Sequence, residues 1–481
     1  MGIKLAPGSR PAVPVSPMGK ASWLGLRFWE RSSQLPEWQP LSVEASMPSR
    51  NIVIVGGGFA GTAAIRRLER HLPAGWRTVL INEETFMTFT PLLPEVVSGS
   101  LFPSHSVSPL RGIVDKAEFV QGCVTRIDPE RREVIYRDHD ERRIEYAHLV
   151  LACGTLANLD IIPGMTEHGL ALKTLGDALH LRNRIIDALE EACQETDPDR
   201  RRWLLRFLVV GGGNSGVEVA GAIYDFLRAA CKHYAGVEEQ DFDIRILEHG
   251  PRLVEEFPKS LGDFAEHTLT QRGIGVHCDT GVSRVTANGA EDQDGNRIDA
   301  ANVVCTVGTQ AYPLIEQLPF EKLKGRLCTE EDMSVKDAEG IWAIGDCAAV
   351  PNHHNGELSP PTAQFAERQG QQLADNIVRC IRGEGSRGFS YRPRGELATI
   401  GHHKAVAQVF GMRFSGRFAW LLWRAFYLFK LPTLLRKVQV YFEWNISMLF
   451  PQDVTQFQFE RSGHRLERER RRAGQREVGQ E

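Results

Sequence analysis

Short apolar runs that end in clustered glycines are the clearest pattern in this chain. The run at residues 52–55 (IVIV) is followed by GGGFAG, and the run at 207–210 (FLVV) is followed by GGGNSG. Continuous apolar residues without polar alternation are typical of a parallel strand covered on both faces. The pattern therefore predicts a strand, a tight turn and a helix at two places in the chain.

Further apolar runs extend both of these units. Residues 78–81 (TVLI) follow the first unit, and residues 243–247 (DIRIL) follow the second. Two more runs, at 149–152 (LVLA) and 341–344 (IWAI), lie on either side of the second glycine cluster. We therefore predict an α/β fold with two Rossmann-like dinucleotide-binding domains, the second inserted into a discontinuous first domain.

The predicted domain boundaries follow from this nesting. Residues 1–50 contain seven prolines and are expected to be a disordered leader or a misassigned start. The remaining predicted regions are 51–165 and 301–395 for the first domain, 166–300 for the inserted domain, 396–460 for a C-terminal membrane-associating region, and 461–481 for a charged, disordered tail.

Both glycine clusters have the GxGxxG spacing of a dinucleotide-binding loop. The first glycine permits the turn, the second lets the backbone approach a pyrophosphate, and the third lets the helix pack on the strand. The helix that follows presents free N–H groups to the phosphates. The residues concerned are Gly56, Gly58 and Gly61 in the first loop, and Gly211, Gly213 and Gly216 in the second. The alternative is a duplicated structural domain that has lost its ligand.

The strand after each loop ends at a residue suited to bind a ribose. Glu248 follows the strand after the second loop, and a carboxylate there favours NADH over NADPH because it repels a 2′-phosphate. Arg252 lies close enough in sequence to leave this preference open. After the first loop the corresponding position holds Asn82, with Glu83 next to it, so the sugar contact there is left open.

Two dinucleotide sites in one chain suggest a division of roles. Asp346 follows the run at 341–344, where it could bind the ribitol chain of a flavin dinucleotide or cap a helix that points at phosphate. Since the first domain surrounds the second, we expect the first loop to hold the flavin and the second to admit a nicotinamide dinucleotide. Two facing nucleotide domains supply the close approach that hydride transfer requires.

Residues 401–450 are basic, aromatic and amphipathic. They contain seven Lys or Arg and one acid, against a net charge of −4 for the whole chain. On a helix that ends at Pro432, seven apolar residues share one face, namely Phe418, Leu421, Leu422, Ala425, Phe426, Leu428 and Phe429. The other side and its edges hold Trp420, Trp423, Arg424, Tyr427 and Lys430. A second segment groups Leu434, Val438, Phe442 and Leu449. The pattern predicts helices lying in the interface of an anionic bilayer, with a dimer interface or packing on the core as alternatives.

Composition argues against several other classes of protein. A net charge of −4 disfavours a nucleic-acid-binding protein that works through positive charge. Among the nine cysteines, no two are closer in sequence than Cys328 and Cys347, which excludes a CxxC pair and a zinc knuckle, so no metal site is expected. No stretch approaches the roughly 20 apolar residues of a membrane-spanning helix.

With these motifs in place, the chain resembles the two-dinucleotide flavoprotein oxidoreductases, and most of all the type II NADH dehydrogenases. These are single-subunit NADH:quinone oxidoreductases that do not pump protons. The resemblance runs from about Asn51 to Gln456, through IVIVGGGFAG, FTPLLPEVVSG, LVLACGTLAN with IPG, VVGGGNSGVEVAG, CTVGTQAYPLI, IWAIGDCA, TAQFAERQG and GRFAWLLWR. The glycine loops indicate only the superfamily, whereas FTPLLPEV, AQFAERQG and AWLLWR are specific to the family.

The resemblance implies noncovalent FAD, NADH as donor, and a membrane quinone (menaquinone or ubiquinone) as acceptor. The FAD-binding positions would be Gly56, Gly58, Gly61, Thr155 and Asp346, and the NADH-binding positions would be Gly211, Gly213, Gly216, Glu218, Glu248 and Gly308. Glu218 matches a family acid near the nicotinamide and the flavin. It is also a residue that the helix dipole would favour in a first turn.

The chain departs from the family in the AQ segment. Gln364 is kept, but residue 368, where many members have a second glutamine, is Arg. A guanidinium could still donate a hydrogen bond to a quinone carbonyl, although Arg368 could equally be a solvated helix residue. The catalytic candidates are therefore Glu218, Gln364 and Arg368.

Two other functions remain open at this stage. A sulfide:quinone reductase would need a cysteine pair beside the flavin, and Cys153 and Cys347 are far apart in sequence. A flavin-bound redox sensor docked on the membrane would show little turnover. The family further implies a peripheral (monotopic) protein on the cytoplasmic face of the bacterial plasma membrane, and a homodimer is left open.

Overall fold

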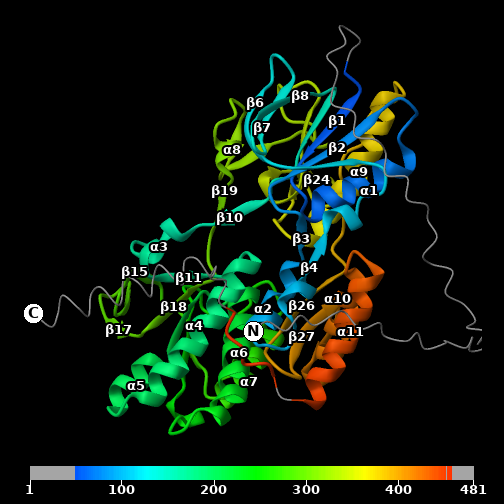
Figure 1. Ribbon diagram of the computed structural model, residues 1–481. Coiled ribbons are helices and arrows are strands. Elements are labelled where there is room, and N and C mark those ends of the chain that lie inside the picture. Colours follow the sequence, from blue (N-terminus) through cyan, green and yellow to red (C-terminus); the bar gives the residue numbers. More distant parts are fainter. Residues whose placement is uncertain (1–48, 451, 458–481) are drawn as a thin grey trace, which may run out of the picture. The chain divides into compact units, whose positions relative to one another are not determined.

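The computed structural model describes residues 49–450 and 452–457 (Figure 1). The charged tail expected at 461–481, and all of the expected leader except Ser49 and Arg50, lie outside the described residues.

The first sheet consists of five parallel strands in the order β22-β9-β1-β2-β5. Its strands are β1 (Asn51–Val55), β2 (Arg77–Asn82), β5 (Glu118–Gln121), β9 (His148–Leu151) and β22 (Ile341–Ala343). Ile52, Val53 and Ile54 in the central strand are completely buried, as a strand covered on both faces requires. Helices α1 (Phe59–His71) and α9 (Ala363–Ile381) pack against each other beside this sheet.

The second sheet is also parallel, in the order β11-β18-β12-β13-β14. Its strands are β11 (Gly169–Ala171), β12 (Arg206–Val210), β13 (Asp243–Leu247), β14 (Gly275–His277) and β18 (Asn302–Cys305). The helices of this part are α4 (Leu175–Gln194), α5 (Pro198–Leu204), α6 (Asn214–Ala230) and α7 (Lys259–Gln271). Because all these strands lie between β9 and β22 in sequence, the predicted fold class is confirmed.

The inserted domain ends later in the chain than the sequence predicts. We placed the end of the inserted domain at residue 300, but β18 pairs with both β11 and β12 inside the second sheet. A short apolar run such as NVVC does not reveal which of two parallel sheets it will join, because that depends on long-range pairing.

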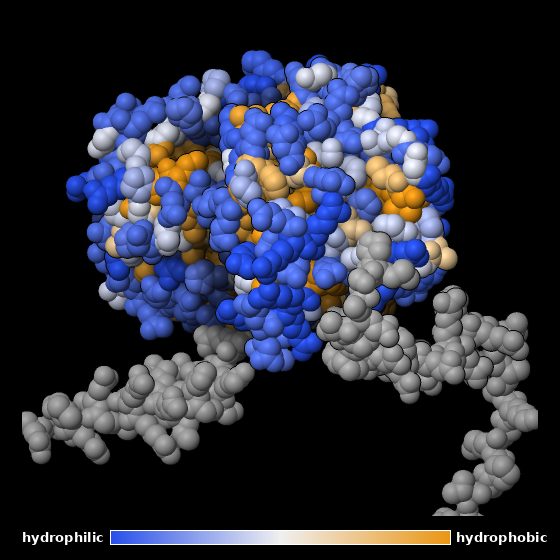
Figure 2. All heavy atoms as spheres, turned by 90° about the horizontal axis from the view of Figure 1, so that it is seen from above, coloured by the Kyte–Doolittle hydropathy of each residue, from blue (hydrophilic) through white to orange (hydrophobic). Residues whose placement is uncertain are grey.

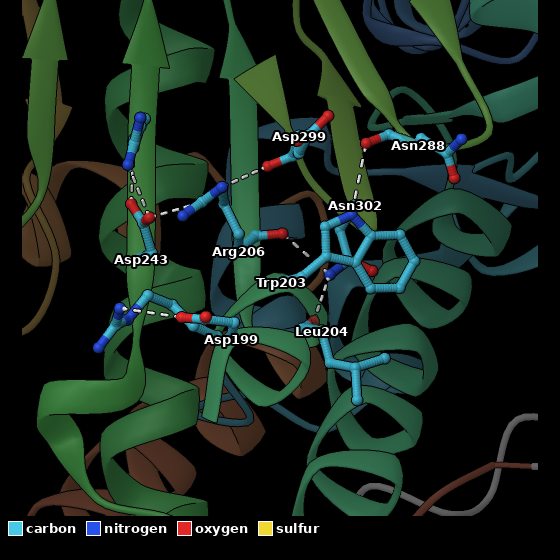
Figure 3. A network of polar contacts seen from close by, with 10 residues as sticks. Asp199, Trp203, Leu204, Arg206, Asp243, Asn288, Asp299 and Asn302 are labelled. Carbon is cyan, nitrogen blue, oxygen red and sulfur yellow. Dashed lines mark hydrogen bonds and ion pairs between the residues drawn. The ribbon is translucent and has the colours of Figure 1, made fainter. Parts of the chain in front are cut away.

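Polar side chains tie the strands of the second sheet together at the end opposite its glycine loop (Figure 3). Arg206 donates hydrogen bonds to the Asp243 carboxylate and to the carbonyl of Asp299. The Asn302 amide donates to the carbonyls of Leu204, at 2.9 Å, and Arg206, at 3.1 Å. These contacts lie at the amino ends of the strands, whereas ligands of open parallel sheets bind at the carboxyl ends.

Smaller elements complete the described chain. Three antiparallel sheets have three strands each: β6 (Cys123–Asp128), β7 (Glu133–Arg137) and β8 (Glu141–Glu145); β15 (Val282–Thr286), β16 (Gly289–Asp292) and β17 (Arg297–Asp299); and β26 (Gly395–Thr399), β27 (Ala405–Val409) and β28 (Met412–Ser415). The other short strands are β3 (Phe86–Thr88), β4 (Val107–Pro109), β10 (Thr155–Ala157), β19 (Thr309–Ala311), β20 (Lys322–Leu323), β21 (Arg326–Cys328), β23 (Ala348–Ala349), β24 (Pro351–Asn352) and β25 (Glu357–Leu358). The short helices are α2 (Leu93–Val97), α3 (Met165–His168) and α8 (Pro313–Glu316).

Two C-terminal helices, α10 (Gly416–Lys430) and α11 (Leu434–Leu449), lie side by side and are separated by a break that contains Pro432 (Figure 1). Their grouping of residues agrees with the predicted amphipathic faces, and the structure decides which side meets the protein. Trp420, Trp423 and Arg424 are buried, whereas 76% of Phe429 is exposed. Indole and guanidinium groups pack inward here because α10 covers a polar interior, which the helical projection could not show.

We call the exposed apolar residues of α10 and α11 the apolar face. Its members are Phe418, Leu421, Phe429, Leu434, Leu435, Val438, Phe442, Ile446 and Leu449. In contrast, the view in Figure 2 shows a face of the molecule that is mostly hydrophilic, with apolar residues in separate patches. No helix in the described part of the chain combines the length and the apolar character needed to cross a bilayer.

The contact between α1 and α9 depends on a glycine. A β-carbon at Gly370 would lie 2.3 Å from the Ala60 carbonyl oxygen and 3.0 Å from the Ala64 nitrogen. We expect Gly370→Ala to destabilise the fold by about 1–3 kcal/mol, because backbone atoms of α1 would have to move. Urea unfolding followed by circular dichroism measures the change.

Gly176→Ala is the matched control, because Gly176 lies in α4 and its β-carbon would approach nothing closer than 3.5 Å. This variant should be neutral or slightly stabilising, since alanine is the better helix former by about 1 kcal/mol. Equal losses in both variants would show that the close approach at Gly370 is unimportant.

Candidate functional site

The two glycine loops have nearly the same geometry. Gly56 has φ 109° and Gly211 has φ 106°, which side chains rarely adopt. A β-carbon at Gly61 would lie 1.9 Å from the Gly56 carbonyl oxygen, and one at Gly216 would lie 1.8 Å from that of Gly211. The first glycine of each loop thus permits the turn, and the third lets the following helix press against it.

The middle glycine of each motif faces open space. A β-carbon at Gly58 or Gly213 would meet no heavy atom within 4 Å. The helices α1 and α6 begin at the next residue, and neither has an acidic residue in its first turn. Free N–H groups at a helix end beside an open, glycine-lined space fit the pyrophosphate of a dinucleotide.

In each domain, a polar side chain at the end of the strand that follows the glycine loop accepts a hydrogen bond from that loop. The Gly57 N–H donates to Oδ1 of Asn82 at 2.7 Å, and the Gly212 N–H donates to the carboxylate of Glu248. The Asn82 amide also donates to the Glu84 carbonyl, so both ends of that side chain are engaged within the protein. Glu83 next to it is exposed. Asn82 and Glu248 therefore have the same role, which is to bind the backbone of the glycine loop.

A lysine that sequence reasoning missed connects two predicted cofactor-binding residues. Nζ of Lys173 lies 3.2 Å from Oγ1 of Thr155 and 4.0 Å from Oδ2 of Asp346. Burial raises the pKa of the Asp346 carboxyl, while Lys173 and Arg326 act against this shift. Lys173 stands just before the helix cap Thr174, and nothing in its local sequence indicates its neighbours.

Gly308 lies at the crossing from the second sheet back to the first. Its φ is 76°, and it precedes β19, which pairs antiparallel with β10. A β-carbon at Gly308 would approach Cδ1 of Ile161 to 3.0 Å. The structure thus places Gly308 and Thr155 on the two-stranded connection between the sheets.

A cavity of about 600 Å³, which we call the central cavity, brings separate parts of the chain together. Its lining includes Phe59 and Thr62 of α1, Asn214 of α6, Gln364 of α9, and Phe426 and Tyr427 of α10. Residues that follow both glycine loops therefore meet the AQ segment and the C-terminal helix around one space.

Gln364 and Arg368 occupy different surroundings although both lie on α9. The Gln364 amide donates to the Gly395 carbonyl at 2.8 Å and accepts from the Tyr391 hydroxyl at 3.3 Å. Arg368 lines a separate cavity of about 390 Å³, where its guanidinium lies 5.7 Å from the centre of the Tyr391 ring. The structure thus brings Gln364 to the central cavity, whereas Arg368 faces Tyr391 and donates a hydrogen bond to Gln371, which lines both cavities.

Glu218 is a carboxyl enclosed between α6, β26 and α10. Burial raises its pKa to about 8, against hydrogen bonding from Thr399, whose backbone N–H donates to Oε1 at 3.0 Å. Glu95 nearby raises this pKa further. Burial also raises the pKa of Tyr427, with Glu218 adding to the shift. Glu218 is therefore mostly protonated at neutral pH.

Glu95 and Arg424 are further functional candidates that sequence reasoning did not single out. Burial raises the pKa of Glu95, and Arg424 lowers it. The Arg424 guanidinium lies 3.9 Å from the centre of the Trp420 ring and 4.9 Å from that of Trp444. The sequence feature that could have indicated Glu95 is that it is the only acid in the apolar segment FTPLLPEVV.

Comparisons with known proteins agree with this architecture. The family described as pyridine nucleotide-disulphide oxidoreductase matches residues 50–370, and the NDH2 C-terminal domain matches residues 394–453. A mitochondrial external alternative NADH-ubiquinone oxidoreductase of Yarrowia lipolytica is 25% identical, covering 92% of this chain and 86% of the relative. A type II NADH:quinone oxidoreductase of Staphylococcus aureus is 28% identical, covering 76% of this chain and 92% of the relative.

Solved structures show the same fold. NDH2 from Plasmodium falciparum in complex with NADH has a TM-score of 0.78 at 20% identity, covering 84% of this chain and 99% of that chain. The sulfide:quinone oxidoreductase from Aquifex aeolicus is less similar, with a TM-score of 0.64 at 19% identity, covering 84% of this chain and 96% of that chain. The chain therefore belongs to the pyridine nucleotide-disulphide oxidoreductase family, and its predicted resemblance to the type II NADH dehydrogenases is confirmed.

Proposed function

We propose that this chain is a type II NADH:quinone oxidoreductase that passes two electrons from NADH to a membrane quinone without pumping protons. The observation that carries this function is the central cavity, which is lined from both glycine-loop helices, from Gln364 and from α10. Donor, flavin and acceptor can therefore meet at one place. The names of the curated relatives support both NADH as donor and a quinone as acceptor.

The first loop fits a noncovalently bound FAD. The pyrophosphate would lie against Gly58, where the backbone is open, and Glu83 would accept hydrogen bonds from the ribose because Asn82 is already engaged. Thr155 and Asp346, joined through Lys173, would bind the ribitol chain. When bound, the flavin accepts two electrons from NADH and passes them on to the quinone. Gly56 and Gly61 would give this loop the tight turn and the close helix contact that the FAD site requires.

The second loop fits NADH rather than NADPH. The pyrophosphate would lie against Gly213, and Glu248 keeps lone pairs for the ribose hydroxyls beyond those used by Gly212 and Gly250. Arg252, four residues after Glu248, donates to the carbonyls of Glu255, at 2.6 Å, and Phe257, at 3.0 Å. Its guanidinium is thus engaged within the protein, which favours a ligand without a 2′-phosphate.

We place the quinone headgroup in the central cavity beside Gln364. The hydrogen bonds to Gly395 and Tyr391 hold the Gln364 amide in one orientation, with a second N–H left for a quinone carbonyl. Arg368 faces the Tyr391 ring and so acts as a positioning residue in this proposal. Glu218, being protonated near neutral pH, holds a proton close to Tyr427 in the cavity wall.

The apolar face is proposed to lie on an anionic lipid surface. Phe429, Leu434 and Leu449 are each at least 75% exposed, and the exposed Arg417 at the start of α10 adds positive charge. Lipid contact would bring Lys430 and Pro432, which line the central cavity, close to the quinone pool. Since NADH is a solute of the cytosol, the docked face in a bacterium would be the cytoplasmic face of the plasma membrane.

Anaerobic spectroscopy tests the function. NADH should bleach the flavin of the FAD-loaded protein, and a menaquinone or ubiquinone analogue should restore the colour. Bleaching by sulfide but not by NADH would instead indicate a sulfide:quinone reductase. Full flavin occupancy with almost no NADH oxidation would indicate a redox sensor.

The same experiment separates the roles of Gln364 and Arg368. Gln364→Leu should slow the recolouring by quinone about ten-fold, as expected for the loss of a hydrogen bond to the reacting substrate, and leave bleaching by NADH within about two-fold. Arg368→Gln should slow recolouring by no more than about three-fold. A larger loss in Arg368→Gln than in Gln364→Leu would place Arg368 in the quinone site itself.

Glu218 should make stability depend on pH. Its pKa is raised to about 8 in the folded protein, so between about pH 4.5 and pH 8 the folded state keeps a proton that the unfolded chain loses. Relative to Glu218→Gln, the wild type should therefore lose up to about 1.4 kcal/mol of unfolding free energy for each pH unit of increase in this range. Urea unfolding at several pH values measures the difference, and parallel curves would show an ordinary pKa.

Membrane attachment should depend on the apolar face. Phe429→Glu combined with Leu434→Glu should lower binding to liposomes that contain phosphatidylglycerol at least ten-fold, because two charges would enter the lipid interface. Leu323→Glu is the control, since Leu323 is exposed but lies on β20. If liposome binding is unchanged and size-exclusion chromatography shows a dimer converting to a monomer, the apolar face is a dimer interface.

A further inference from the structure

A second cavity, of about 390 Å³, is lined almost entirely by charged and polar side chains. We call it the arginine cavity, because its lining contains Arg67, Arg368, Arg379 and Arg387 but only one acid, Asp375. Its volume is that of about 13 water molecules in the liquid, which leaves room for a small polar group. The proposed function assigns no ligand to this cavity.

One side of α9 supplies most of the lining. Gln371, Gln372, Asp375 and Arg379 follow Arg368 at helical spacing, so all five side chains share one face of the helix. A further arginine comes from α1, which lies against α9 in Figure 1. Residues of the segment 387–391, which follows α9, complete the lining.

Two amide side chains of α9 hold this segment on the helix. Asn376 accepts a hydrogen bond from the Arg387 N–H at 3.0 Å and donates one to the Arg387 carbonyl at 2.9 Å. Gln372 donates to the Gly388 carbonyl at 2.8 Å. Asn376 is buried, whereas Arg387 is exposed. The backbone of Arg387 is therefore fixed beside the cavity, and its side chain stays accessible.

Two of the four arginines already have carboxylate partners. Arg67 donates to both oxygens of Asp375, at 2.8 Å and 3.0 Å. Arg379 lies 2.9 Å from the carboxylate of Glu384 and also donates to the Gly385 carbonyl at 2.7 Å. These contacts hold both guanidinium groups in place and compensate their charges.

The other two arginines lack such a partner. Arg368 and Arg387 form no ion pair with any residue that the structure describes. The Arg368 guanidinium donates only to the neutral Gln371, at 3.2 Å, and faces the ring of Tyr391. The arginine cavity therefore carries two positive charges that no carboxylate of the described chain balances.

Two acids near the segment after α9 do not change this balance. Oε2 of Glu331 lies 3.7 Å from Nδ1 of His353, and the Asp332 carboxylate accepts hydrogen bonds from the hydroxyls of Ser334 and Ser386. Neither acid lines the arginine cavity.

We propose that the arginine cavity binds a phosphate group, with Arg368 and Arg387 as its charge partners. A phosphate monoester carries about two negative charges at neutral pH, which the two unpaired guanidinium groups would balance. Arginine is suited to phosphate because its planar group donates two parallel hydrogen bonds. The amide of Gln371 and the hydroxyl of Ser390 supply further donors in the lining.

An anionic lipid headgroup and a soluble phosphate ester present the same group to these arginines. The arginine cavity shares Arg67 and Gln371 with the central cavity, whose lining also includes Lys430 and Pro432. Arg66 donates to the Pro432 carbonyl at 3.3 Å, in the break between α10 and α11. A lipid headgroup could therefore reach the site from the proposed membrane surface, and a soluble ester could reach it from water.

Calorimetry on the full-length, FAD-loaded protein tests the soluble source. NAD⁺ is kept at saturation so that both glycine loops are occupied, and inorganic phosphate or glycerol 3-phosphate is the probe. Arg368→Gln combined with Arg387→Gln should weaken binding of the probe at least ten-fold, because two charge-assisted hydrogen bonds are lost.

Arg382→Gln combined with Arg392→Gln is the matched control. Both residues are exposed and lie in the same basic stretch, but neither lines the arginine cavity. This double variant loses the same charge and should change binding by no more than about two-fold, since salt screens charges outside the site. An equal loss in both double variants would show general attraction by a basic surface and overturn the site.

Liposomes of phosphatidylcholine with and without phosphatidic acid test the lipid source. If the ligand is a headgroup, the soluble probes should not bind, and phosphatidic acid should increase attachment of the wild type. The double variant at Arg368 and Arg387 should lose at least ten-fold of this increase, whereas the control double variant should keep it.

Phenylglyoxal labelling of the wild type gives a readout that needs no variant to fold. The probe that binds should slow the modification of Arg368 and Arg387 but not that of Arg382 and Arg392, as measured by mass spectrometry. Absence of binding in both arms, or equal protection of all four arginines, would overturn the proposal. No step of these measurements uses electron transfer, so a failed phosphate site and a failed NADH:quinone activity are separate results.

Discussion

Close approach of backbone to backbone at glycine is the constraint on which the rest of this structure depends. Gly61 and Gly216 let their helices touch the carbonyls of the turns before them, and Gly370 lets α9 meet α1 in the same way. At Gly221, a β-carbon would lie 2.7 Å from the Gly401 nitrogen, so α6 presses against the turn between β26 and β27. These contacts fix how closely α1, α6 and α9 approach their neighbours, and thereby the walls of the central cavity.

The C-terminal helices link this cavity to the surroundings of the protein. The inner side of α10 supplies Trp423, Arg424 and Tyr427 to the polar interior, while its outer side leaves Phe418 and Phe429 exposed. The same helix therefore closes the site and presents the apolar face. An acceptor that dissolves in lipid needs both properties in one element, because it must leave the bilayer close to the place where it is reduced.

Enclosed carboxyls give the interior its chemistry. Glu218 and Glu95 lie behind the cavity wall, and burial raises the pKa of each. Such groups can hold protons at neutral pH where exposed carboxyls could not. Asp225, two helical turns after Glu218, is instead paired with Arg272 and lines a separate cavity of about 590 Å³. One side of α6 thus carries both an ion-paired carboxyl, Asp225, and an enclosed carboxyl held by hydrogen bonds, Glu218.

The sequence by itself determined the repeated strand, turn and helix units, because continuous apolar runs and GxGxxG spacing depend on local backbone geometry. It also predicted the nesting of the two sheets and the grouping of residues on α10, since both follow from periodicity and order along the chain. Only the tertiary structure decided which side of α10 is buried, that β18 joins the second sheet, and that Arg368 turns toward Tyr391. It alone brought Lys173 to Asp346, and Glu95 to Glu218 and Arg424. These relations join residues that are distant in sequence, and their energies come from burial and charge, which no local pattern specifies.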